Sequence, residues 1–142
     1  MTTPTILLAE EAPNVRQVLA FILEEHGYRV LQSWDGRDTL AQAREHVPDL
    51  LVMESMLPYR TGFEICAVLK RDQRLCRIPI LMTSALTRGL GQGDEYWRAR
   101  CSADDFLSKP FDMTELLWRI ERLLEASRRR RPDVRDEAGI PR

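Results

Sequence analysis

The sequence predicts a single α/β domain with a doubly wound, five-stranded parallel sheet and helices on both faces. Three observations predict this class. Five short apolar runs alternate with segments of helical periodicity. The third run, residues 50–53, is apolar throughout, as is typical of strands buried on both faces. The chain has 142 residues, 44% hydrophobic and 30% charged, which is enough for one domain with a proper core.

The five strands are predicted from short apolar runs bounded by polar or turn-forming residues. They cover residues 6–9, 28–31, 50–53, 80–83 and 105–107. Because crossovers between parallel strands are right-handed, helices pack on both faces of such a sheet. The carboxyl ends of the strands then form one edge, where folds of this kind bind their ligands.

The first helix is predicted between Pro13, which opens it, and Gly27, which ends it. Four apolar residues at i, i+3, i+4 and i+7 spacing form its predicted inward face. They are Val15, Val18, Leu19 and Ile22.

Four further helices follow. The second is capped by Asp35 and stops before Pro48, and a short third helix carries Ile65, Cys66 and Leu69. A glycine-rich loop at residues 86–93 precedes a fourth helix at about 94–100. A capping box at Asp112-x-x-Glu115 opens the last helix. Its inward face is predicted to hold Leu116, Leu117, Ile120, Leu123 and Leu124.

Polar residues follow the strands at the carboxyl edge of the predicted sheet. Glu10 and Glu11 come after the first strand, and Glu54 comes directly after the third. Ser84 and Lys109 follow the fourth and fifth strands. Because these strand ends meet at one edge, we expect the five side chains in one crevice.

Four sequence blocks resemble the receiver domain of bacterial two-component response regulators, the CheY-like module. The blocks are Leu-Leu-Ala-Glu-Glu-Ala-Pro (7–13), Pro-Asp-Leu-Leu-Val-Met-Glu-Ser-Met-Leu-Pro-Tyr-Arg-Thr-Gly-Phe-Glu (48–64), Ile-Pro-Ile-Leu-Met-Thr-Ser-Ala (78–85) and Ala-Asp-Asp-Phe-Leu-Ser-Lys-Pro-Phe (103–111). Among receivers, those joined to winged-helix DNA-binding domains resemble this sequence most. The resemblance implies a flavodoxin-like strand order of 2-1-3-4-5. It also implies a receiver domain at residues 1–126, followed by an Arg-rich tail at 127–142 that we expect to be disordered.

The resemblance implies a role for each acidic residue of the crevice. In receivers an aspartate after the third strand takes a phosphoryl group from a histidine kinase, and Glu54 stands at that position. Two acids after the first strand position Mg²⁺; Glu10 and Glu11 match them, with Glu11 the more direct ligand. The backbone carbonyl of Met56, two residues beyond the acceptor, would be the last Mg²⁺ ligand that the protein provides.

The family's switch residues also have counterparts here. They are Ser84, Phe106 and Lys109. Pro110 follows the lysine, and this peptide bond is often cis in the family. For Phe106, a core position without a switch role is favoured over a switch role.

Glutamate in place of the acceptor aspartate is the main departure from the family. The extra methylene moves a carboxylate by more than ~1 Å, and errors of that size are costly to in-line transfer. The longer Glu54 carries its charge outward, where the Lys109 ammonium and the Ser84 hydroxyl can form charge-assisted hydrogen bonds with it. The sequence therefore favours an atypical single-domain response regulator, a pseudo-receiver. It would act by protein–protein contact, with phosphorylation weak or absent.

Two other functions stay open. One is a working phospho-switch, in which a histidine kinase phosphorylates Glu54 with Mg²⁺ held by Glu11. The other is a DNA-associated regulator that uses the arginine run. Residues 128–142 hold six arginines against three acids, a net charge of +3, which leaves −4 for the rest of the chain. Since the total is only −1, a solvated tail is favoured over nucleic-acid binding.

The partner surface implied by the family consists of the fourth helix, the fifth strand and the fifth helix. Trp34, Trp97 and Trp118 are predicted to be partly buried, with Trp97 or Trp118 a candidate for partner binding. Four charged residues on this surface can form ion pairs across a homodimer or within one protomer, and the sequence leaves both open. They are Asp104, Asp105, Arg119 and Arg122.

Several functional classes are not expected. No run of ~20 apolar residues and no signal peptide is visible, so we expect no contact with membranes. The three cysteines lack Cys-x-x-Cys spacing and are predicted to be reduced thiols in a cytoplasmic protein. With no catalytic triad, zinc motif or Gly-rich phosphate loop, the sequence does not predict an independent enzyme.

Overall fold

The computed structural model describes residues 3–84 and 102–130 of the chain. Five parallel strands form one sheet in the order β2-β1-β3-β4-β5. The strands are β1 (Thr5–Ala9), β2 (Arg29–Ser33), β3 (Leu50–Glu54), β4 (Ile80–Ser84) and β5 (Asp105–Ser108). Both the parallel sheet and its predicted strand order are confirmed.

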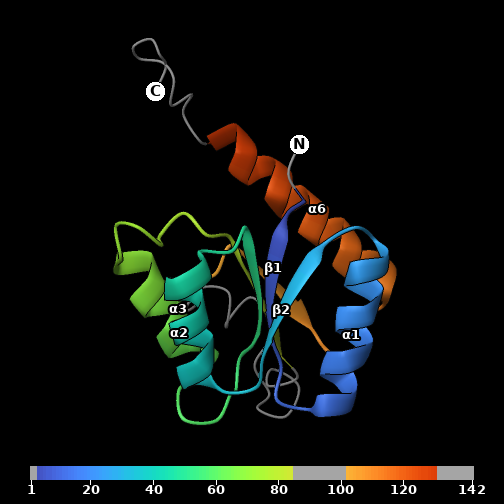
Figure 1. Cartoon of the computed structure of the whole chain (residues 1–142), viewed down its shortest axis with the longest axis horizontal. Coiled ribbons are helices and arrows are strands. Elements are labelled where there is room, and N and C mark those ends of the chain that lie inside the picture. The colour runs from blue at the N-terminus through green and yellow to red at the C-terminus, as the bar shows by residue number, and fades with distance from the viewer. Residues whose placement is uncertain (1–2, 85–101, 131–142) are drawn as a thin grey trace.

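Four helices are present among the described residues, and they cover both faces of the sheet. They are α1 (Pro13–Glu25), α2 (Gly36–His46), α3 (Gly62–Arg71) and α6 (Met113–Arg130). Figure 1 shows α1 and α6 on one side of the sheet and α2 and α3 on the other. The predicted loop at 86–93 and helix at 94–100 lie outside the described residues.

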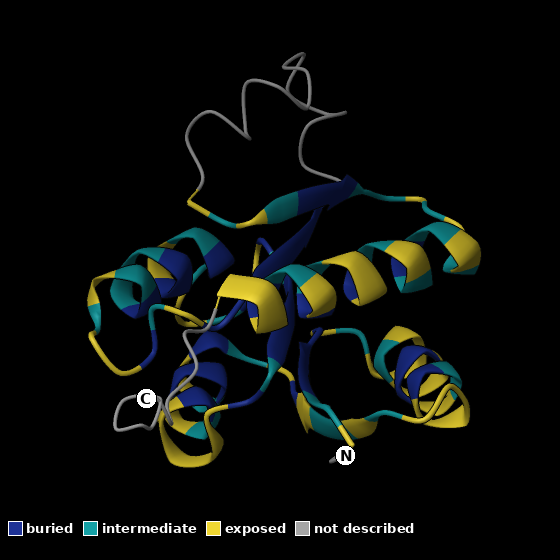
Figure 2. Ribbon diagram, turned by 90° about the horizontal axis from the view of Figure 1, so that it is seen from above, coloured by how far each residue is buried: buried dark blue, intermediate teal, exposed yellow. Residues whose placement is uncertain are grey.

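Alternation along the strands gives the sheet two cores, because successive side chains point to opposite faces. Leu7, Leu51 and Met53 pack with α2 and α3. Ile6 and Leu8, their neighbours along β1, pack with α1 and α6. The central strands are therefore dark in Figure 2, and the exposed residues, in yellow, lie mainly along the helices and loops.

The strands extend further than predicted at the carboxyl edge. Glu54, Ser84 and Ser108 are the last residues of β3, β4 and β5, not the residues that follow them. Backbone pairing continues to these positions, with Glu54 opposite Thr83 and Ser84 opposite Ser108. A strand ends where pairing ends, not where the apolar run ends, and the site residues are therefore held by the sheet itself.

The predicted inward face of α1 is wrong for two of its four residues. Val15 is 41% exposed and Val18 57% exposed, while Leu19 is buried as predicted. The buried face also holds Ala20 and Leu23. Apolar residues occupy two adjacent faces of this helix, so periodicity alone could not choose between them; packing against the sheet did.

Helix ends agree with the sequence where local chemistry defines them. Asp35 caps α2, its Oδ1 accepting a hydrogen bond from the backbone nitrogen of Asp38 at 2.8 Å. Asp112 accepts from the backbone nitrogen of Glu115 at 2.8 Å, which is one half of the predicted capping box. A complete capping box that the sequence analysis missed joins Thr61 and Glu64 at the start of α3.

Helix α6 crosses the predicted boundary at residue 126. It continues to Arg130, and Ser127 is 5% exposed. Leu116, Ile120 and Leu124 are buried as predicted, so the first part of the predicted tail continues a helix anchored in the core. Residues 131–142 lie outside the described part of the chain.

Two tryptophans are more exposed than predicted. Trp34 is 55% exposed and Trp118 is 52% exposed, and each ring lies near an arginine, Arg16 and Arg122 respectively. Trp97 is outside the described residues. Within the described ranges, no helix combines the length and the apolar character needed to cross a bilayer.

Candidate functional site

The candidate site lies where β1, β3 and β5 end on the same edge of the sheet. Backbone hydrogen bonds tie the following loops to neighbouring strands. Glu10 N–H donates to the Ser33 carbonyl at 3.0 Å, and Lys109 N–H donates to the Ser84 carbonyl at 2.9 Å. These bonds fix the backbone positions of Glu10 and Lys109, so that both side chains start from the edge of the sheet where the crevice was predicted.

Lys109 bridges two carboxylates in this crevice. Its Nζ lies 2.9 Å from Oε1 of Glu10 and 2.5 Å from Oε1 of Glu54. The side chains are largely withdrawn from solvent, with exposed fractions of 7% for Glu10, 13% for Glu54 and 26% for Lys109. Residues 99 and 55 positions apart in sequence therefore form one charge cluster with a net charge of −1.

Two opposing effects, burial and the neighbouring carboxylates, act on the pKa of Lys109. Burial by itself would lower it, because a low-dielectric surrounding disfavours the charged form. The hydrogen bonds that the ammonium donates to Glu54 and Glu10, together with the negative charges of these carboxylates, outweigh burial and raise the pKa above the ordinary lysine value. The ammonium is therefore fully charged at neutral pH.

The second oxygen of each carboxylate also accepts a hydrogen bond. Oε2 of Glu10 accepts from the backbone nitrogen of Ala12 at 3.1 Å. Oε2 of Glu54 accepts from the backbone nitrogen of Met56 at 3.4 Å, a long contact. All four oxygens of the two glutamates thus have a donor within the chain.

Glu11 and Met56 lie at the outside of the cluster. Glu11 is exposed, and the Met56 residue is 49% exposed. Arg16 binds the backbone here, its Nη1 donating to the Glu10 carbonyl at 2.8 Å and to the Glu11 carbonyl at 3.3 Å. Arg16 was not recognised from the sequence, where an arginine on a predicted helix gives no specific signal.

In the described arrangement Glu10 and Glu54 face the Lys109 ammonium and not a set of metal ligands. Among residues 3–84 and 102–130, no three or more His, Cys, Asp or Glu side chains are grouped so that they could hold a metal. The Lys109 ammonium occupies the space between Glu10 and Glu54, and the two carboxylates are already charge-paired. Mg²⁺ ligation by Glu11 and by the Met56 carbonyl stays a prediction.

Ser84 and Phe106, the two other predicted switch residues, are both buried. Ser84 accepts a hydrogen bond from the Ser55 hydroxyl at 2.7 Å, a partner that the sequence analysis missed. Phe106 is 2% exposed and packs in the core between the sheet and helices α2 and α3. The predicted hydrogen bond from Ser84 to Glu54 is not among the described contacts, whereas the predicted bond from Lys109 is present.

Gly62 sets the distance between β3 and the start of α3. Its N–H donates to the Ser55 carbonyl at 2.7 Å. A Cβ at this position would lie 2.7 Å from the Glu54 carbonyl oxygen and 2.9 Å from Met82 Sδ. Only glycine fits without a shift of backbone, so Gly62 supports the position of Glu54.

Ion pairs within the chain engage three of the four charged residues predicted for a dimer surface. Arg119 Nη1 lies 2.8 Å from Asp105, and Lys70 Nζ lies 2.8 Å from Asp104. The guanidinium of Arg122 lies 4.7 Å from the centroid of the Trp118 ring. These contacts correspond to the within-protomer alternative, while homodimerisation stays a prediction.

This order of strands, with acids after β1, a carboxylate closing β3 and a lysine followed by a cis-proline after β5, defines a receiver, a class of signalling domain. The chain belongs to this family: the sequence model of the response regulator receiver domain matches residues 6–121.

Two curated relatives differ in length. The DNA-binding dual master transcriptional regulator RpaA from Synechocystis sp. is 39% identical over 127 residues, which are 89% of this chain and 51% of that protein. Protein PilH from Pseudomonas aeruginosa is 32% identical over 119 residues, 84% of this chain and 96% of that protein. The chain therefore spans about half the length of RpaA and nearly all of PilH.

Solved receiver structures share the fold. A putative response regulator from Chloroflexus aurantiacus is 28% identical, with a TM-score of 0.77 over 87% of this chain and 99% of that one. The receiver domain of a sensor histidine kinase from Pseudomonas aeruginosa is also 28% identical, with a TM-score of 0.77 over 87% of this chain and 99% of its own. That structure holds a magnesium ion in its active-site cleft.

Proposed function

We propose that this receiver is a pseudo-receiver in two-component signal transduction, with phosphorylation weak or absent. It would act by protein–protein contact. One observation carries the proposal: the Glu54 carboxylate, at the acceptor position, is held by the Lys109 ammonium at 2.5 Å. The same ammonium holds Glu10 at 2.9 Å, so both carboxylates share one cation from the chain itself.

Phosphoryl transfer to a carboxylate needs a free oxygen lone pair aimed at phosphorus. In this pocket Oε1 of Glu54 accepts from Lys109, and Oε2 accepts from the Met56 backbone. The side chain is 13% exposed, so a phosphodonor has little access to it. Each oxygen keeps a second lone pair, but pairing with the ammonium lowers the nucleophilicity of Oε1 and holds the side chain in one orientation.

The ammonium also takes the charge-balancing place of a divalent cation. Two carboxylates withdrawn from water need a nearby positive charge, since isolated buried charges are costly. Lys109 supplies one positive charge against two negative ones. We expect Mg²⁺ to bind weakly here, because it would compete with an ammonium that is covalently part of the chain.

The partners that fit this proposal are a histidine kinase or another signalling protein in the cytoplasm. Homodimerisation through β5 and α6 belongs to the same proposal. DNA binding is named for RpaA, a protein of which this chain covers 51%, and we do not extend it to this chain. The net charge of −1 gives no field that would attract nucleic acid.

Intact-mass spectrometry tests the proposal directly. The protein is incubated with Mg²⁺ and acetyl phosphate, beside Glu54→Asp and the matched control Glu64→Asp, an exposed glutamate at the start of α3. We expect no phosphoryl adduct on the wild type or on the control. An adduct on Glu54→Asp would show that the longer side chain is what disconnects the pocket from phosphate.

A phosphoryl adduct on wild type, lost in Glu54→Gln, would overturn the proposal. The chain would then be a working phospho-switch, and the next search would be for its kinase. If neither wild type nor Glu54→Asp reacts, the charge cluster as a whole, and not the length of one side chain, keeps phosphate out. Calorimetric titration of Glu54→Asp with Mg²⁺ then shows whether this variant fails to react because it does not bind the metal or because its carboxylate does not attack.

A further inference from the structure

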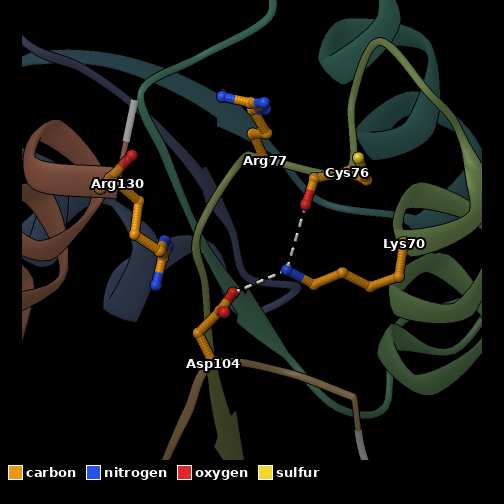
Figure 3. Close-up of a pocket in the computed structure, with 6 residues that line it drawn as sticks. Lys70, Cys76, Arg77, Asp104 and Arg130 are labelled. Carbon is orange, nitrogen blue, oxygen red and sulfur yellow. Dashed lines mark hydrogen bonds and ion pairs between the residues drawn. The ribbon is translucent and has the colours of Figure 1, made fainter. Parts of the chain in front are cut away.

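A second concave site lies at the opposite edge of the sheet from Glu54. It is a cavity of about 350 Å³ near the amino ends of β4 and β5, between the segment that precedes β4 and the last turns of α6. Its lining residues are Lys70, Cys76, Arg77, Asp104, Ser127 and Arg130. Figure 3 shows five of them around the opening, with Arg130 and Lys70 approaching from opposite sides.

The cavity is strongly positive. Lys70, Arg77 and Arg130 face a single carboxylate, that of Asp104, which gives the lining a net charge of +2. Asp104 is already engaged, because its Oδ2 accepts from Lys70 Nζ at 2.8 Å and from the Ile80 backbone nitrogen at 2.8 Å. Within the described residues, neither Arg77 nor Arg130 has a carboxylate partner.

A buried hydroxyl adds a polar group to the lining. Ser127 is 5% exposed, yet its hydroxyl forms no hydrogen bond with any described residue. Buried polar groups without a partner are uncommon, because leaving one unpaired costs free energy. A ligand oxygen in the cavity would supply the partner.

Two of the lining residues lie beyond the part of the chain that matches the receiver family. The family match ends at residue 121, whereas α6 continues to Arg130 and brings Ser127 and Arg130 to the cavity. The cavity is therefore built partly from an extension of the last helix.

We propose that this cavity binds a small phosphate-bearing molecule. Guanidinium groups present planar, forked donors that match the oxygens of phosphate, and they keep their charge at any physiological pH. Two guanidiniums, a lysine and a serine hydroxyl around about 350 Å³ suit a di- or polyphosphate group better than a simple halide or a carboxylate. The recessed site favours a small molecule over a duplex backbone, which would bind an open basic surface.

Isothermal calorimetry with inorganic pyrophosphate tests the proposal on the full chain. EDTA is present throughout, so the measurement does not depend on metal at the acidic pocket. We expect saturable binding with one molecule per chain. Arg77→Gln and Arg130→Gln should each weaken it about tenfold or more, because each removes a charged donor. Arg29→Gln, at an exposed position on the far strand β2, is the matched control and should bind as wild type does.

Ser127→Ala separates a built site from diffuse attraction, since it removes a donor without changing charge. We expect it to weaken pyrophosphate binding a few-fold while the urea midpoint stays close to that of wild type. The proposal is overturned if wild type shows no saturable binding, or if the two arginine variants bind as tightly as wild type. It is also overturned if duplex DNA binds at the same ionic strength and pyrophosphate does not.

Discussion

The ammonium of Lys109 lies 2.5 Å from Oε1 of Glu54, at the position where receivers carry their phosphate-accepting aspartate. The same nitrogen lies 2.9 Å from Oε1 of Glu10, so one lysine joins the ends of β1, β3 and β5. This relationship leads to the first two predictions.

Replacing Lys109 with methionine should destabilise the fold. The substitution keeps most of the side-chain volume but leaves Glu10 and Glu54, 7% and 13% exposed, without their common cation. We expect the free energy of unfolding in urea at pH 7 to fall by about 1–3 kcal/mol. Adding Glu54→Gln should recover part of this loss, because it removes one of the two facing charges. If the changes in the free energy of unfolding of the two substitutions simply add, energetic coupling between Lys109 and Glu54 is contradicted.

Stability should fall at alkaline pH in a way that depends on Lys109. Because hydrogen bonds with Glu54 and Glu10 raise its pKa, the ion pairs contribute fully below the ordinary lysine value of about 10.4. The contribution is lost as pH rises through the higher pKa of the folded state. We expect the urea midpoint to fall more steeply in wild type than in Lys109→Met between roughly pH 10 and 12. Burial raises the pKa of Tyr28, which titrates in both proteins and cancels in the comparison.

The orientation of α1 can be tested with a matched pair of substitutions. Leu23 is fully buried and Phe21, two residues earlier, is 61% exposed. We expect Leu23→Ala to lower the free energy of unfolding by about 2–5 kcal/mol and Phe21→Ala by less than about 1 kcal/mol. Chemical denaturation measures both. Equal losses would contradict the orientation of α1 in which Leu23 is buried and Phe21 is exposed.

The pairing of Arg119 distinguishes contacts within the chain from contacts across a dimer. Its guanidinium donates to Asp105 at 2.8 and 2.9 Å and to Glu115 at 2.8 Å. Because these partners are in the same chain, Arg119→Gln should cost about 0.5–1.5 kcal/mol of folding stability. Sedimentation velocity should show an unchanged oligomeric state. A lower sedimentation coefficient for the variant would instead indicate ion pairs that cross a dimer.

Much of the fold could be predicted because its signals are local. Apolar runs, the Asp35 cap and the breaks at Gly27 and Pro48 act over a few residues, and each of these features is in the structure. Because the strands of a parallel sheet end at one edge, the sequence also predicts that Glu10, Glu54 and Lys109 share one crevice. The contact from Lys109 to Glu54 was predicted on this basis and is confirmed.

Other features needed the assembled structure. Two adjacent apolar faces on α1 made Val15 and Val18 as plausible as Ala20 and Leu23 for the inward side. The hydroxyl of Ser84 was expected at Glu54 but accepts from Ser55, because the backbone bond from Ser55 to the Thr83 carbonyl draws the ends of β3 and β4 together. No local pattern carries this information.

The sequence by itself determined the order of elements and the set of charged residues at the carboxyl edge, since these depend on local propensity, periodicity and parallel-sheet topology. Its four motif blocks carried the resemblance to the receiver family. Only the tertiary structure decided that Lys109 reaches both Glu10 and Glu54 and that α6 extends to Arg130. It also decided that a positive cavity forms at the opposite edge. Side-chain distances of a few ångströms, and the depth at which each group is withdrawn from water, are set by packing between segments far apart in the chain.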